Sequence, residues 1–109
     1  MSGNIAGAQS AGKSYEAARE ATRRAVFLNV ARSLDSGEEH RQGLAAVFQA
    51  CRERALEAGA ACGMTMEQVD ADISQICDED VVSLRAATDE EFRAFANESG
   101  EVVQRFLLG

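Results

Sequence analysis

The chain has 109 residues, a formal net charge of −7 and 46% hydrophobic residues, which is the balance of one small globular domain rather than of a disordered chain. Proline and tryptophan are absent and alanine is frequent, so the composition favours helix over sheet. No apolar run approaches the ~20 residues that a membrane span needs, and the N-terminus does not resemble a signal peptide. With three cysteines and no secretion signal, we expect reduced thiols and a cytoplasmic location.

The charge is distributed unevenly along the chain. Residues 1–60 carry eight basic and seven acidic side chains, whereas residues 61–109 carry three basic and eleven acidic ones. An acidic second half repels nucleic acid and anionic lipid, so we expect neither direct nucleic-acid binding nor membrane binding. A protein with a basic surface is the expected partner.

Residues 1–13 are small and polar without periodicity, and we expect them to form a mobile arm before a single helical domain over residues 14–109. The end of this arm satisfies the phosphate-loop pattern G-x-x-x-x-G-K-[ST] through Gly7, Gly12, Lys13 and Ser14. Such a loop needs a buried strand before it and a parallel sheet behind it, and the sequence predicts neither. Nucleotide-dependent function at residues 7–14 is therefore only a third hypothesis.

The first two predicted helices span residues 15–34 and 36–59. Ser14 and Ser36 are the predicted N-terminal caps, and Gly59 is the predicted end of the second helix. Apolar residues of the second helix recur at helical spacing, so we expect it to be the central helix against which the others pack. The short connection at residues 35–37 predicts that the two helices are antiparallel neighbours. The apolar stripe of the second helix consists of Leu44, Val47, Phe48, Cys51, Ala55 and Ala58.

The third predicted helix begins at Thr65, whose capping box is closed by Gln68 and whose hydrophobic staple joins Met64 and Val69. It either continues to about residue 86 or breaks at the acidic run 78–80, and a kink or break is the favoured alternative. The last helix begins at Thr88 and runs to the chain end. The predicted fold is thus an all-α bundle of four helices, or five if the third one breaks.

No pattern in the sequence indicates a catalytic, cofactor-binding or metal-binding site, and we expect the chain not to be an enzyme. The single histidine, His40, has no Cys or His cluster beside it. Asp70, Asp72 and Ser74 begin like a calcium loop, but the pattern then lacks its glycine and its final glutamate. Cys51 and Cys77 lie on apolar stripes, which leaves Cys62 as the cysteine expected in a loop.

Two acidic runs, at residues 78–80 and 89–91, are the candidate partner-binding surface. Acidic residues are also common in first helical turns and on solvated faces, so each run alone is weak evidence. The apolar chain end, with Phe106, Leu107 and Leu108, is expected to dock either on this domain or on another copy, which makes a homodimer an open alternative. The candidate acidic residues are Asp78, Glu79, Asp80, Asp89, Glu90 and Glu91.

Two functional hypotheses follow from these observations. The leading one is a non-enzymatic acidic, helical interaction, adaptor or regulatory module, with self-association left open. The alternative is a small acidic inhibitor that imitates nucleic acid and occupies the basic groove of a nucleic-acid-binding protein, as phage- or plasmid-encoded antagonists do. This alternative rests on size and charge only.

Overall fold

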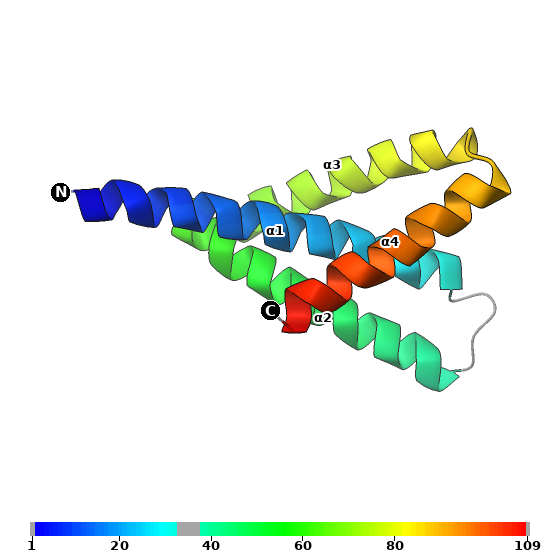
Figure 1. The fold of residues 1–109 in the computed structure, drawn as a ribbon. Coiled ribbons are helices and arrows are strands. Elements are labelled where there is room, and N and C mark those ends of the chain that lie inside the picture. Colours follow the sequence, from blue (N-terminus) through cyan, green and yellow to red (C-terminus); the bar gives the residue numbers. More distant parts are fainter. Residues whose placement is uncertain (1, 33–37, 109) are drawn as a thin grey trace.

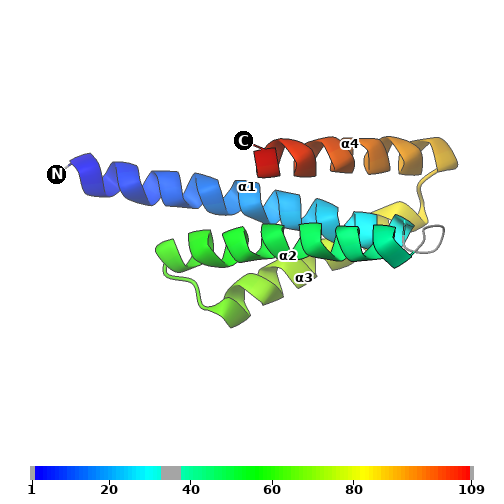
Figure 2. The same ribbon diagram turned by 90° about the horizontal axis from the view of Figure 1, so that it is seen from below.

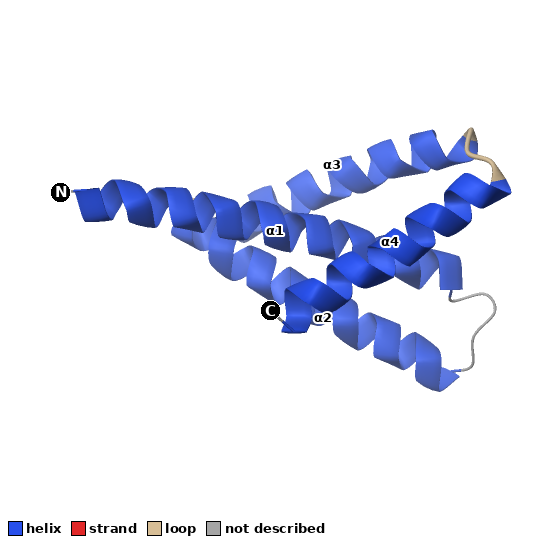
Figure 3. Cartoon of the chain, viewed as in Figure 1, coloured by secondary structure: helices blue, strands red, loops and turns tan. Residues whose placement is uncertain are grey.

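In the computed structural model the chain folds into four α-helices: α1 (Ser2–Arg32), α2 (Glu38–Ala61), α3 (Met66–Arg85) and α4 (Asp89–Leu108) (Figure 1). The structure describes residues 2–32 and 38–108, and it describes the side-chain surroundings of residues 14–30 and 42–108. These residues contain helices, turns and no strand (Figure 3), so the predicted all-α fold is confirmed. The predicted cap at Ser36 and the turn at residues 35–37 lie outside the described residues.

The first helix begins earlier than predicted. Residues 2–13 are helical and belong to α1, so the predicted start of the helix after Ser14 is wrong. The segment contains no proline, and its alanines favour a helix that continues from Tyr15, although its three glycines weaken that preference. This end of α1 projects past the other helices (Figure 1). The mobility of residues 1–13 and the domain boundary at residue 14 stay predictions.

The second helix ends two residues later than predicted, at Ala61. Gly63, and not the predicted Gly59, takes the left-handed conformation that ends the helix, with φ of 85°. The Met64 N–H donates to the Gly59 carbonyl at 2.8 Å and the Gly63 N–H donates to the Ala60 carbonyl at 3.0 Å, which together form a Schellman motif. Gly59 is instead a buried residue at the point where α2 approaches α1 and α3.

The predicted beginnings of α3 and α4 are confirmed. Thr65 and Gln68 form a reciprocal capping box before α3, and Thr88 and Glu91 form the same arrangement before α4. The favoured kink at residues 78–80 is wrong, because α3 is a single helix through this acidic run. Asp80 faces α1 and is ion-paired there, while Asp78 and Glu79 lie in solvent, so no repulsion forces the helix apart.

The central helix of the bundle is α1, not the predicted second helix. Figure 2 shows α3 and α4 on opposite sides of α1, with α2 beside α1. One core cluster joins α1 and α2 to α4 around Ala21, Ala25 and Cys51, and the other joins them to α3 around Ala18 and Val69. The alanines of α1 allow its neighbours to approach closely on several sides. The outward face of α2 stays in solvent.

The chain end docks on its own domain. Phe106 packs against both core clusters and Leu107 packs against the one that contains Val103. Arg54 of α2 donates a hydrogen bond to the Phe106 carbonyl at 3.0 Å and lies 5.2 Å from its ring centroid. Leu108, at 79% exposed, is the only one of the three predicted self-association residues that lies fully in solvent.

Candidate interaction surface

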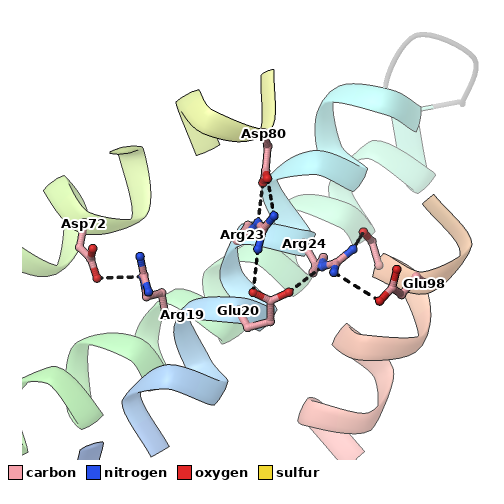
Figure 4. Close-up of polar contacts among 8 residues, drawn as sticks. Arg19, Glu20, Arg23, Arg24, Asp72, Asp80 and Glu98 are labelled. Atoms are coloured by element: carbon pink, nitrogen blue, oxygen red, sulfur yellow. Dashed lines mark hydrogen bonds and ion pairs between the residues drawn. The ribbon is translucent and has the colours of Figure 1, made fainter. Parts of the chain in front are cut away.

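Arginines of α1 connect this helix to the acidic side chains of α3 and α4. Arg23 reaches α3 and Arg24 reaches α4, and Glu20 lies between the two guanidinium groups (Figure 4). Charges of opposite sign therefore alternate from Asp80 of α3 across α1 to Glu98 of α4. We refer to this set as the ionic chain: Asp80, Arg23, Glu20, Arg24 and Glu98.

Arg23 and Asp80 form the tightest link in the ionic chain. The Arg23 Nε donates to Asp80 Oδ2 at 2.6 Å and the Nη2 donates to Oδ1 at 2.5 Å, so the pair is bidentate. Asp80 is buried, and its hydrogen bonds raise the pKa of the Arg23 guanidinium although burial acts in the opposite direction. This pair fixes the C-terminal half of α3 against α1.

Arg24 fixes α4 against α1 in the same way. Its Nε donates to Glu20 at 2.8 Å, its Nη1 donates to the buried Ser99 Oγ at 3.2 Å, and its Nη2 lies 3.5 Å from Glu98. The guanidinium carbon lies 4.3 Å from the Phe95 ring centroid, which adds a cation–π contact. Burial opposes the charge on Glu20, but hydrogen bonds from the two arginines outweigh it and lower the Glu20 pKa.

Two further ion pairs secure the N-terminal half of α3. Arg19 lies 2.9 Å from Asp72, which also accepts a hydrogen bond from the Tyr15 hydroxyl at 2.6 Å. Arg52 of α2 donates to both carboxylate oxygens of Asp70, at 3.0 and 2.8 Å, and these bonds lower the Asp70 pKa. The two aspartates that resemble the start of a calcium loop thus bind arginines of the same chain.

These contacts reduce the number of candidate acidic residues that are available to a partner. Asp80 is buried in the ionic chain, whereas the other five candidates are exposed. Glu91 accepts the Thr88 N–H at 3.3 Å in the α4 capping box. The acidic rim, as we call it, is the set of four exposed carboxylates at the α3–α4 turn for which the described residues provide no hydrogen bond or ion pair: Asp78, Glu79, Asp89 and Glu90.

An apolar groove lies between α1, α3 and α4 and reaches the α3–α4 turn. Its volume is about 280 Å³. We call it the α1–α3–α4 groove, and the apolar side chains that line it are Val26, Phe27, Val30, Val81, Leu84 and Phe92. Cys77, Arg23, Asp80 and Arg85 complete its lining. Among these polar groups, Arg23 and Asp80 bind each other.

α3 and α4 diverge from their connecting turn (Figure 1), and the groove lies where both of them meet α1. Phe92 stacks edge-on against Phe27, with ring centroids 5.2 Å apart, yet it remains exposed on its outer side. Val81 is 51% exposed, and Val82, beside it on α3, is 69% exposed. Most of the large exposed apolar side chains in the described residues therefore gather at this one end of the molecule. The groove is not visible in the sequence, because its lining residues come from three different helices.

The acidic rim borders this groove. Asp78 precedes Val81 and Val82 by one helical turn on α3, and Asp89 precedes Phe92 by one turn on α4. The two acidic runs therefore lie on different helices, on either side of the turn at residues 86–88. Arg85 and Arg93 are the basic residues of the same region. Acidic and apolar side chains are thus placed together on one surface.

The cysteines differ in exposure. Cys62 is exposed after the end of α2, Cys77 is half-buried in the groove and Cys51 is buried. Burial raises the pKa of both Cys77 and Cys51, and it takes the Cys51 pKa to about 11. Within the described part of the chain, no three His, Cys, Asp or Glu side chains are placed to hold a metal ion. His40 lies outside the residues whose side chains are described.

None of the described helices combines the length and apolar character required to cross a membrane. Comparisons with models of protein families, with curated proteins and with solved structures find no match to this chain.

Proposed function

We propose that the chain is a non-enzymatic interaction module that binds a protein with a basic surface at the α1–α3–α4 groove. The observation that carries this proposal is the gathering of the exposed side chains of Val81, Val82 and Phe92 beside the acidic rim. Contact between large apolar side chains and water is unfavourable, and covering them with a partner's apolar surface recovers free energy. The carboxylates supply orientation and attraction for a basic partner.

The groove's polar groups favour binding over catalysis. Arg23 and Asp80 are committed to each other in the ionic chain. The nucleophile in the groove is Cys77, and burial first, with nearby carboxylates, raises its pKa and disfavours the reactive thiolate. A nucleophilic mechanism needs an activating base or a lowered pKa, but the carboxylate in the groove lining, Asp80, is bound to Arg23 and the Cys77 pKa is raised.

The acidic inhibitor is the second candidate, and the acidic rim is the observation that favours it. An imitation of nucleic acid requires many free carboxylates at its surface. Asp70, Asp72 and Asp80 are bound to arginines of the same chain, which reduces that supply. This places the inhibitor second. The phosphate-loop hypothesis gains no support, because residues 7–14 are helical.

The test is affinity capture from a lysate of the source cell with matched baits. Val81→Asp introduces a charge into the groove, and Met66→Asp introduces the same charge at an exposed apolar site (57% exposed) at the opposite end of α3. A third bait carries Asp78→Asn, Glu79→Gln, Asp89→Asn and Glu90→Gln.

We expect a partner that the wild type and Met66→Asp retain and that Val81→Asp loses. A nucleic-acid-binding protein that only the neutralised bait loses, and that moderate salt releases from the wild type, would move the inhibitor to first place. Identical retention by all four baits contradicts both candidates.

A further inference from the structure

We propose that the occupant of the α1–α3–α4 groove is an amphipathic α-helix of another protein. Its apolar face would lie on Val81 and Phe92 in the groove, and Lys or Arg side chains beside that face would meet the acidic rim. This inference rests on the proposed function and specifies the chemical class of the partner.

The groove is small and its polar groups are few. Pockets that enclose small molecules measure roughly 300–1,000 Å³ and combine an apolar lining with a small number of polar groups placed to orient the ligand. This groove has a volume of about 280 Å³. Of the polar side chains in its lining, Arg23 and Asp80 bind each other and Cys77 is a thiol, which leaves Arg85 to orient a ligand. Such a site fits the anchoring side chains of a macromolecule better than an entire small ligand.

The backbone around the groove favours a helical occupant. All three walls are helices, whose backbone N–H and C=O groups bond within their own helix. An extended peptide buried here would find no strand edge and would leave its own backbone groups unsatisfied. A helix satisfies its own backbone. It also matches the packing of the bundle, in which α1 already has α2, α3 and α4 as helical neighbours.

The charge around the groove favours a basic occupant. Residues 78–93 carry six acidic and two basic side chains, and Asp80 is the one of these six that Arg23 neutralises. The acidic rim therefore leaves an excess of negative charge next to the apolar lining. Lys and Arg suit the flank of such a helix because their long aliphatic parts extend along apolar surface while their charges reach carboxylates.

A second copy of this chain fits the groove less well. Its arginine-rich helix is α1, and Arg19, Arg23 and Arg24 are engaged with carboxylates of the same molecule. These arginines are therefore not available to attract the acidic rim of a second copy.

The test uses three synthetic peptides of equal length and equal apolar content. The first is an amphipathic helix of leucine and alanine with Lys and Arg beside the apolar face. The second replaces these basic residues by Glu, and the third contains the residues of the first in an order that destroys the apolar face. Binding to the full chain is measured by fluorescence anisotropy at low and moderate salt.

We expect the first peptide to bind at least about tenfold more tightly than either of the others, and moderate salt to weaken it. Val81→Asp should weaken that binding by about tenfold or more, whereas Met66→Asp should leave it unchanged. Val81→Ser, which adds no charge, should weaken it to a smaller extent. Because Val81 is half exposed, we expect the variants to keep the wild-type circular dichroism spectrum and thermal unfolding.

Other outcomes overturn this inference in distinguishable ways. Equal binding of the basic and the reordered peptide would mean that the acidic rim attracts positive charge without a helix-binding groove. If Val81→Asp loses a partner from the lysate but the chain shows no preference among the peptides, the proposed function stands and the helical occupant is contradicted. A dimer in light scattering that Val81→Asp dissociates would assign the groove to a second copy. Identical capture by all baits and no peptide preference would remove both proposals.

Discussion

Arg23 of α1 and Asp80 of α3 form a bidentate ion pair, with Nε–Oδ2 and Nη2–Oδ1 distances of 2.6 and 2.5 Å, in the half of α3 that has the least apolar packing. The buried apolar residues of α3, Val69 and Ile73, both lie in its N-terminal half. The C-terminal half contributes the partly buried Cys77 and Leu84 to the core and leaves Val81 and Val82 exposed. The ion pair therefore fixes the wall of the groove without filling the groove.

Asp80→Asn should destabilise the domain, because it removes a buried charge while Arg23 stays charged and partly buried. We expect a loss of about 1–3 kcal/mol in the free energy of unfolding, measured by urea denaturation at neutral pH. Glu79→Gln, at the exposed neighbouring position, should change it by less than about 0.5 kcal/mol. Equal effects of the two substitutions would show that the ion pair does not hold α3.

Two glycines of α2 should respond to alanine in opposite directions. A Cβ at Gly59 would lie 2.5 Å from Val69 Cγ2 and 3.5 Å from the Tyr15 ring, whereas a Cβ at Gly43 would meet nothing within 4 Å. Gly59→Ala should therefore destabilise the domain by about 1–3 kcal/mol through overpacking. Gly43→Ala should stabilise it by about 0.5–1 kcal/mol through helix propensity. Thermal unfolding of both variants checks this, and a stabilised Gly59→Ala would contradict the close approach.

The sequence was sufficient for the beginnings of α3 and α4 and for the core face of α2. Capping boxes depend on residues three positions apart, so Thr65 with Gln68 and Thr88 with Glu91 are visible in the sequence. The stripe of α2 follows helical spacing and lies in the core as predicted. Gly59 was assigned wrongly, since its role depends on contact with Val69 and not on its place near a helix end.

The way the helices pack against one another could not be predicted from the pattern of residues along the chain. The uneven charge indicated a partner protein with a basic surface, but a pair such as Arg23 with Asp80 lies 57 positions apart in the chain and has no local signature. Asp80 therefore stood among the surface candidates although it is buried. The groove depends on the divergence of α3 and α4, which no periodicity encodes.

The three thiols should react with an alkylating reagent in the order Cys62, Cys77, Cys51. Cys62 is exposed, while burial raises the pKa of Cys77 and brings that of Cys51 to about 11. At mildly alkaline pH the raised pKa leaves a smaller fraction of Cys51 than of an ordinary cysteine as thiolate, and burial also shields its sulfur from the reagent, so Cys51 should react most slowly. Peptide mapping by mass spectrometry after timed alkylation measures the order. Fast labelling of Cys51 in the folded protein would contradict its burial.

Tyr15 offers a spectroscopic test of the contact between α1 and α3. It is the only tyrosine and the chain has no tryptophan, so tyrosinate absorbance reports this residue alone. Burial first, and then the hydrogen bond to Asp72, raise the Tyr15 pKa well above its ordinary value of about 10. The phenol should therefore stay protonated in the folded protein at pH values where the unfolded chain ionises.

The consequence for stability follows from linkage. Folding raises the Tyr15 pKa, so the protonated phenol stabilises the folded state. This contribution to the free energy of unfolding is fully present below about pH 10 and is lost as the pH rises further. Asp72→Asn should lower the Tyr15 pKa without restoring the ordinary value, since burial is the larger cause. Tyr15→Phe has no ionisable phenol, so its free energy of unfolding should fall less steeply at alkaline pH than that of the wild type. Urea denaturation of the wild type and Tyr15→Phe across the alkaline range measures this difference. Tyrosinate formation near pH 10 in the folded wild type would mean that Tyr15 is neither buried nor bonded to Asp72.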